Sequence, residues 1–68
     1  MDHDNLNIEI RKFLKKVGIS SQRVIETLIT EKLKSGDINI GDDIELEMKL
    51  SINKLKKDHI VAEKIRIK

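Results

Sequence analysis

The first half of the chain carries apolar side chains at the spacing of an α-helix. Five of them recur every three or four residues and share one helix face: Leu6, Ile10, Phe13, Leu14 and Val17. Asp4 or Asn5 can accept the unpaired amide hydrogen bonds at the start of this helix. Gly18 is predicted to end it, because glycine adopts the left-handed conformation at little cost. The pattern therefore predicts a helix over about residues 4–17.

A second apolar stripe follows after a short gap. Ser20 and Ser21 are both candidate N-caps, and five apolar residues then continue at helical spacing: Val24, Ile25, Leu28, Ile29 and Leu33. Gly36 is the predicted stop. These features predict a second helix over about residues 21–35. A link as short as Gly18 to Ser20 would place the two helices at a corner or in an antiparallel pair.

The second half of the chain alternates between apolar and polar residues. The alternation is unbroken from Ile44 to Ile52 and predicts a strand over about residues 44–52. Residues 53–58 are the predicted turn, and a second strand is expected over about 59–67. Two arrangements of this last strand are open. Either Glu63 shares the apolar face, or a bulge around Ala62–Lys64 switches the register.

One architecture buries all of these apolar faces. Two N-terminal helices packed on one face of a C-terminal antiparallel β-hairpin would form a two-layer α+β fold. Ile38 and Ile40 can add a short third strand at 37–40. Because the chain has 68 residues, we expect a single small domain over residues 1–68.

Composition excludes several classes of protein. The chain has no cysteine, which rules out disulfides, thiolate catalysis and zinc–thiolate sites. Its longest apolar run, Ile60 to Ala62, is far shorter than the roughly 18 residues of a membrane span. The polar and acidic start, MDHDNLN, is unlike a secretory signal. We therefore expect a cytoplasmic protein without a membrane partner.

No group of residues has the pattern of a catalytic or cofactor site. Each of the three glycines stands at an expected helix stop or turn, so a phosphate-binding loop is missing. Ser20 and Ser21 are interpreted as helix caps, since no histidine is near them in sequence to activate a nucleophile. His59 has no second metal ligand at a usual spacing. We expect no enzyme activity, no cofactor and no metal site.

The charges are arranged in blocks that suit a partner surface. Residues 1–10 carry −3, residues 11–23 carry +5, residues 36–48 carry −5 and residues 49–68 carry +5. Such a patchwork favours electrostatic matching with a protein partner. The predicted contact surfaces are the open edge of the hairpin and four basic residues: Arg11, Lys12, Lys15 and Lys16. The leading hypothesis is a non-catalytic protein-interaction or self-associating domain, with a homodimer among the expected forms.

A nucleic-acid-binding module is the alternative. In that interpretation the two helices form a helix-turn-helix-like corner, and the hairpin acts as a basic wing. The candidate contacts are seven polar and basic residues: Gln22, Arg23, Thr27, Thr30, Lys54, Lys56 and Lys57. Against it stand Glu26 and Glu31 on the same proposed reading helix.

The segment LNIEIRKFLKKVGISSQRVIE at Leu6–Glu26 carries a resemblance. It resembles a family of small bacterial proteins classified as a domain of unknown function, most closely over Ile10–Arg23. The resemblance implies a similar plan of helices followed by a hairpin across the whole chain. It implies no activity, cofactor or catalytic residue.

Overall fold

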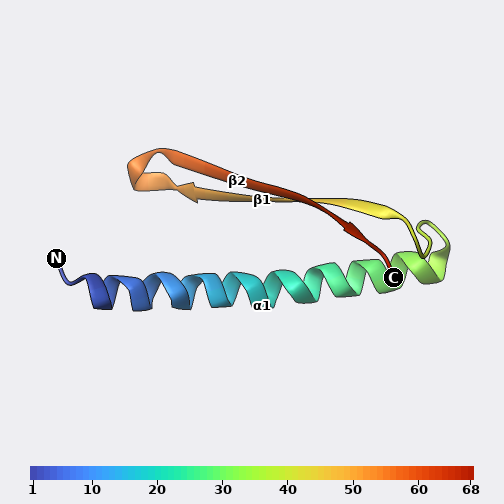
Figure 1. Cartoon of the computed structure of the whole chain (residues 1–68), viewed down its shortest axis with the longest axis horizontal. Helices are drawn as coiled ribbons and strands as arrows, with labels where there is room; N and C mark the ends of the chain where they lie inside the picture. Colours follow the sequence, from blue (N-terminus) through green and yellow to red (C-terminus); the bar gives the residue numbers. More distant parts are fainter. The chain divides into compact units, whose positions relative to one another are not determined.

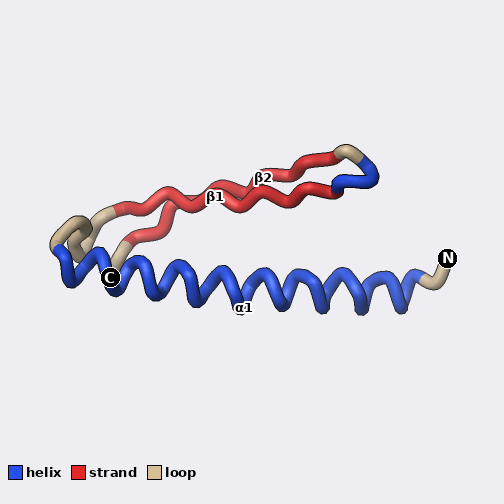
Figure 2. Tube along the Cα trace, turned by 180° about the vertical axis from the view of Figure 1, so that it is seen from behind, coloured by secondary structure: helices blue, strands red, loops and turns tan.

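The computed structural model describes all 68 residues and has one long helix followed by a two-stranded antiparallel sheet. Helix α1 spans His3–Ser35, strand β1 spans Asp43–Ile52, the short 3-10 turn η1 spans Asn53–Leu55 and strand β2 spans Lys57–Arg66. Figure 1 labels these elements, and Figure 2 shows the same chain coloured by secondary structure. The chain forms two compact units, residues 1–37 and residues 38–68.

The prediction of two N-terminal helices is wrong, because α1 is continuous through Gly18 and both serines (Figure 1). Gly18 is an interior helical residue, and glycine there costs only about 1 kcal/mol relative to alanine. The Ser20 hydroxyl caps no helix start. It donates to the backbone carbonyls of Lys16 and Val17, at 2.8 and 3.3 Å, a local bond that helical serine makes readily. The helix corner and the two-helix layer are therefore absent.

The two ends of α1 have clear chemical causes. The N-cap is Asp2, upstream of the two predicted caps, and its carboxylate accepts from the Asn5 amide at 3.2 Å. At the other end Gly36 has a φ of 81°. The Gly36 amide donates to the Leu33 carbonyl and the Asp37 amide donates to the Lys32 carbonyl, at 3.3 and 3.0 Å. This is a Schellman motif, and it depends on the left-handed glycine.

Strands β1 and β2 pair without a bulge from Asp43↔Arg66 to Ile52↔Lys57. Glu63 therefore lies opposite Leu46 and shares the apolar face, which decides between the two arrangements left open by the sequence. The turn between the strands contains Lys56 in a left-handed conformation, with a φ of 51°. The sheet has two strands, so the third strand predicted at 37–40 is not formed. Residues 36–42 are turns, held in part by the Asn39 amide, which donates to the Asp42 carboxylate at 2.8 Å.

Burial inside this chain is slight. Ile67 is the one buried residue, at 6% exposure, and α1 has none. The apolar side chains of α1 that sequence reasoning assigned to a core are mostly more than one third exposed. Helices in proteins owe most of their stability to packing of an apolar face, and a two-stranded hairpin is marginal by itself. Both units therefore leave apolar surface available for further contacts.

Gly18→Ala is expected to raise the stability of the folded state by about 0.5–1 kcal/mol, because alanine loses less backbone entropy in a helix interior. An added Cβ at Gly18 would meet nothing within 4 Å. Thermal melting followed by circular dichroism at a fixed protein concentration measures the change as a higher Tm.

The matched control is Gly36→Ala. Space is equally open there, but the φ of 81° strains any L-residue, so this change is expected to cost about 1 kcal/mol or more. A lower Tm for Gly18→Ala as well would indicate that Gly18 adopts a non-helical conformation, and it would contradict a continuous α1.

Candidate functional site

The basic cluster predicted as a partner surface lies in the N-terminal half of α1. Its four members are all exposed: Arg11, Lys12, Lys15 and Lys16. In the helix predicted over residues 4–17 they would lie near the carboxyl end. In a helix that runs to Ser35 they are several turns from the carboxyl end, where the helix dipole favours cations. Only Lys12 has an ion-pair partner, Glu9 at 3.6 Å, so the cluster keeps most of its positive charge free.

The basic cluster lies opposite most of the exposed apolar side chains of α1, with Ile8 and Ile19 as exceptions on the basic side. Successive helical residues are rotated by about 100°. This rotation gathers the basic cluster on one side and an apolar stripe on the other. We define the α1 stripe by its six exposed apolar members: Leu6, Ile10, Phe13, Leu14, Val24 and Leu28. Their exposures lie between 42% and 59%. The helix thus presents two distinct exposed surfaces, one apolar and one cationic.

The seven alternative nucleic-acid contacts are divided between the two units. Four lie on α1: Gln22, Arg23, Thr27 and Thr30. Three lie in the tip of the hairpin or just after it: Lys54, Lys56 and Lys57. The Gln22 amide already donates to the Glu26 carboxylate at 2.9 Å. Because α1 is continuous, it forms no helix-turn-helix corner, and the recognition geometry assumed for the alternative is missing.

The hairpin separates its side chains into a charged face and an apolar face. On the charged face the two strands are joined by three ion pairs: Arg66–Asp43 at 3.1 Å, Lys49–Asp58 at 3.5 Å and Lys64–Glu45 at 3.8 Å. All three pairs are solvent-exposed, so each contributes at most about 1 kcal/mol. Arg66 and Lys64 lie directly opposite Asp43 and Glu45, and Asp58 lies diagonally across from Lys49, so all three pairs favour the observed register.

The other face is largely apolar and carries the predicted strand pattern. From β1 it includes five residues: Ile44, Leu46, Met48, Leu50 and Ile52. From β2 the register brings Val61 and Ile65 to the same face, together with His59 and Glu63. None of these side chains is fully buried. This face is a second surface with unsatisfied apolar area.

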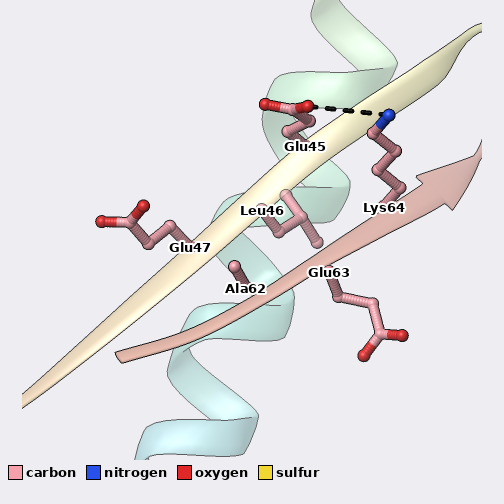
Figure 3. Close-up of a pocket in the computed structure, with 6 residues that line it drawn as sticks. All are labelled: Glu45, Leu46, Glu47, Ala62, Glu63 and Lys64. Carbon is pink, nitrogen blue, oxygen red and sulfur yellow. Dashed lines mark ion pairs between the residues drawn. The ribbon is translucent and has the colours of Figure 1, made fainter. Parts of the chain in front are cut away.

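Figure 3 shows a shallow hollow of the hairpin with charged walls. It is lined by residues from both faces: Glu45, Leu46, Glu47, Ala62, Glu63 and Lys64. The Glu45 carboxylate pairs with Lys64, while the carboxylates of Glu47 and Glu63 point away from it and from each other (Figure 3). Carboxylates that diverge cannot share a proton or a cation. The chain likewise holds no cluster of three or more potential metal ligands.

These features define a class: a small helix-plus-hairpin protein with open apolar surfaces. The family model described as "Family of unknown function (DUF6494)" matches residues 1–68. The chain belongs to this family. Comparison with curated proteins and with solved structures found no match.

The length of α1 does not make it a membrane span. Although the helix has 33 residues, its apolar side chains form a stripe among many charged residues, and no stretch of it is apolar enough to cross a bilayer.

Proposed function

We propose that this protein is a small, non-catalytic interaction domain that acts by self-association. The carrying observation is the near absence of buried side chains in a chain with well-formed elements, Ile67 being the exception. Apolar patches left open on small proteins mark surfaces that contact another molecule. A bacterial origin and a cytoplasmic location belong to the proposal, and cell fractionation tests the location.

The α1 stripe is the main contact surface in this proposal. Five of its members, at positions 6, 10, 13, 24 and 28, together with the partly buried Val17, follow the three- and four-residue spacing of a helix–helix seam. Ser20 interrupts this spacing midway. A second copy of α1 would present the same stripe and would place apolar side chains against apolar side chains.

Burial of the α1 stripe supplies a free energy comparable with the cost of association. Complete burial of one Leu, Ile, Val or Phe side chain is worth about 1.5–3 kcal/mol. Six side chains that are about half exposed therefore hold about 6 kcal/mol in each helix, or about 12 kcal/mol in two. Association costs about 4–15 kcal/mol in lost freedom. The stripe alone can meet all but the upper part of this range, and the hairpin surfaces add further apolar area.

Molar mass across concentration tests the proposal. Sedimentation equilibrium from low micromolar to high micromolar protein is expected to show a mass that rises from 7.9 kDa toward a small whole multiple of it. A strict monomer at every concentration would contradict self-association.

Nucleic-acid binding is the alternative, and it rests on the basic cluster of α1 without a helix corner to position it. Titration of labelled protein with a mixed-sequence duplex at low and moderate salt separates the two functions. Our proposal predicts that any amide shifts are weak, unsaturated and abolished by moderate salt. Saturable binding that persists and includes Arg23, Thr27 and Lys54 would favour the alternative.

A further inference from the structure

Strand β1 has a free edge whose hydrogen-bonding groups are regularly spaced. The sheet has only two strands, so the outer side of β1 is unpaired. The Ile67 amide donates to the Asp42 carbonyl at 2.9 Å. In an antiparallel ladder the backbone N–H and C=O groups of successive residues point to alternate sides of the strand. The backbone groups of even-numbered residues of β1 therefore point toward β2, and those of odd-numbered residues point to the unpaired edge. The strand has no proline and no bulge, two devices that protect edges.

We propose that two copies of this chain pair through their β1 edges, antiparallel and with a two-fold axis at Met48. The result is one continuous four-stranded sheet. This inference rests on the proposed self-association and specifies its partner, strand and register.

The apolar side chains of β1 select this pairing because they are symmetric about Met48. When Met48 faces Met48 of the second copy, Leu46 lies opposite Leu50 and Ile44 lies opposite Ile52. Five apolar pairs thus form on one face, since each unlike pair occurs twice. Apolar cross-strand pairs stabilise a sheet by about 0.2–1 kcal/mol each. A register shifted by one residue would put the apolar face of one copy on the same side of the sheet as the charged face of the other copy, and it is therefore disfavoured.

The charges of β1 select the same register independently. With Met48 on the axis, Glu47 lies opposite Lys49 of the second copy, and the pair occurs twice. Glu47 has no ion pair in its own chain, where it lies opposite Ala62. Lys49 contacts Asp58 at 3.5 Å and is 57% exposed, so its ammonium has donors left for a second carboxylate. A shift of the axis to residue 47 or 49 sets two like charges directly opposite each other, which destabilises strand pairing.

The edge of β2 fits a second copy less well. Its apolar residues are divided between the faces, with Val61 and Ile65 on one and Ile60 and Ala62 on the other. No register of β2 against itself can therefore assemble an apolar row. For this reason we assign the strand pairing between copies to the β1 edge and not to the β2 edge, in addition to the contact through the α1 stripe.

Cysteine cross-linking tests the register directly, because the natural chain has no cysteine. The backbone N–H and C=O of Met48 bond to β2 and not across the free edge. Met48 and Met48 of the second copy would therefore form a non-hydrogen-bonded pair, with Cα atoms about 4.5 Å apart. This separation suits a disulfide. Met48→Cys is expected to form a disulfide-linked dimer under mild oxidation at concentrations where the natural protein self-associates.

Leu46→Cys and Leu50→Cys are the matched controls. Each would stand about 13 Å from its own copy across the axis and should not cross-link alone. A mixture of the two should form a mixed disulfide, because residues 46 and 50 are opposite in this register. Cross-linking of Glu47→Cys with itself, or none at Met48→Cys, would overturn the inference.

Charge reversal supplies a readout that needs no disulfide. E47K and K49E each place like charges opposite each other twice, so each variant alone is expected to associate at least tenfold more weakly. A mixture of the two should recover association, because every pair across the axis is then of opposite sign. Equal association of variants and mixture would refute the register.

Molar mass separates failure of this inference from failure of the proposed function. If the reduced Met48→Cys variant self-associates but does not cross-link on oxidation, the β1 edge is not the interface and self-association stands. If the natural chain and all variants are monomers, self-association itself is wrong and the inference falls with it. Circular dichroism of each reduced variant confirms that the hairpin is folded.

Discussion

Phe13→Ala is expected to raise the dissociation constant of the self-associated form by at least about 100-fold. Phe13 is the only aromatic residue, and it lies in the α1 stripe. Removing a buried Phe side chain costs about 3–5 kcal/mol, and each 1.4 kcal/mol is tenfold in a dissociation constant. Phe13 is half exposed within one chain. Only part of that cost is therefore a loss of contacts inside the chain, and the rest is a loss of contacts between copies. Sedimentation equilibrium measures the dissociation constant.

Lys12→Ala is the matched control for this change. Lys12 is the neighbouring residue, its side chain is 70% exposed, and its one ion pair, to Glu9, is an exposed pair on the helix surface. Such pairs contribute about 0.3–0.5 kcal/mol, so the dissociation constant should stay within a factor of about two or three. If Phe13→Ala associates as tightly as Lys12→Ala, the α1 stripe is not the contact surface.

Phe13 also shows where interpretation of the sequence reached its limit. The periodicity around it correctly indicated a helix with one apolar side. The same periodicity cannot indicate what covers that side, because a stripe buried inside a chain and a stripe buried between chains have the same spacing. The sequence interpretation assigned Phe13 to an internal core, whereas the structure leaves it about half exposed.

The hairpin could be predicted because the alternation of apolar and polar residues and the polar turn at 53–58 indicate the same structure. The alternation from Ile44 to Ile52 predicts β1 within one residue of its observed bounds. The open question at Glu63 could not be decided from the sequence, since a carboxylate opposite Leu46 is unfavourable only if that face is fully dry. In the structure Leu46 is only partly buried and Glu63 is exposed, so the regular register costs little and no bulge is needed.

The break between two helices was predicted from local residues that did not outweigh the continuity of α1. Gly18, Ser20 and Ser21 are common at helix boundaries, but each is also tolerated inside a helix at a cost of about 1 kcal/mol or less. A signal for continuity was present. Val17 and Val24 are seven residues apart, so the apolar stripes before and after Gly18 lie on the same side of one helix. A true corner would not need to preserve this phase.

The role of the predicted site residues stays a prediction, and the structure adds their arrangement. The basic cluster is exposed, and it lies opposite Phe13 and Leu14 in the helix predicted over 4–17 as well as in α1; the continuous helix adds Val24 and Leu28 to the same apolar side. The self-complementary order of Glu47, Met48 and Lys49 was visible in the sequence. Its meaning depends on the observed two-stranded sheet, because only an unpaired β1 edge can meet a second copy of itself.

Ile67→Ala is expected to lower the free energy of unfolding by about 2–4 kcal/mol, the range for removal of a buried isoleucine side chain. Ile67 is the one buried residue of the chain. Its amide donates to the Asp42 carbonyl and its carbonyl accepts from the Gly41 amide, at 2.9 and 2.7 Å. These two bonds close the open end of the hairpin. The alanine variant keeps both backbone bonds and loses the apolar side chain that excludes water from them.

Ile60→Ala is the control, since Ile60 lies on β2, the strand that ends just before Ile67, and is 55% exposed. Its replacement should cost less than about 1 kcal/mol, because little of its surface leaves water on folding. Chemical denaturation at one protein concentration gives both free energies, and amide exchange of Ile67 reports on the hairpin end directly. Equal effects of the two variants would show that burial of Ile67 does not hold this end closed. A larger effect for Ile67→Ala, with faster exchange at its own amide, would show that one side chain fixes the end from which β1 presents its free edge.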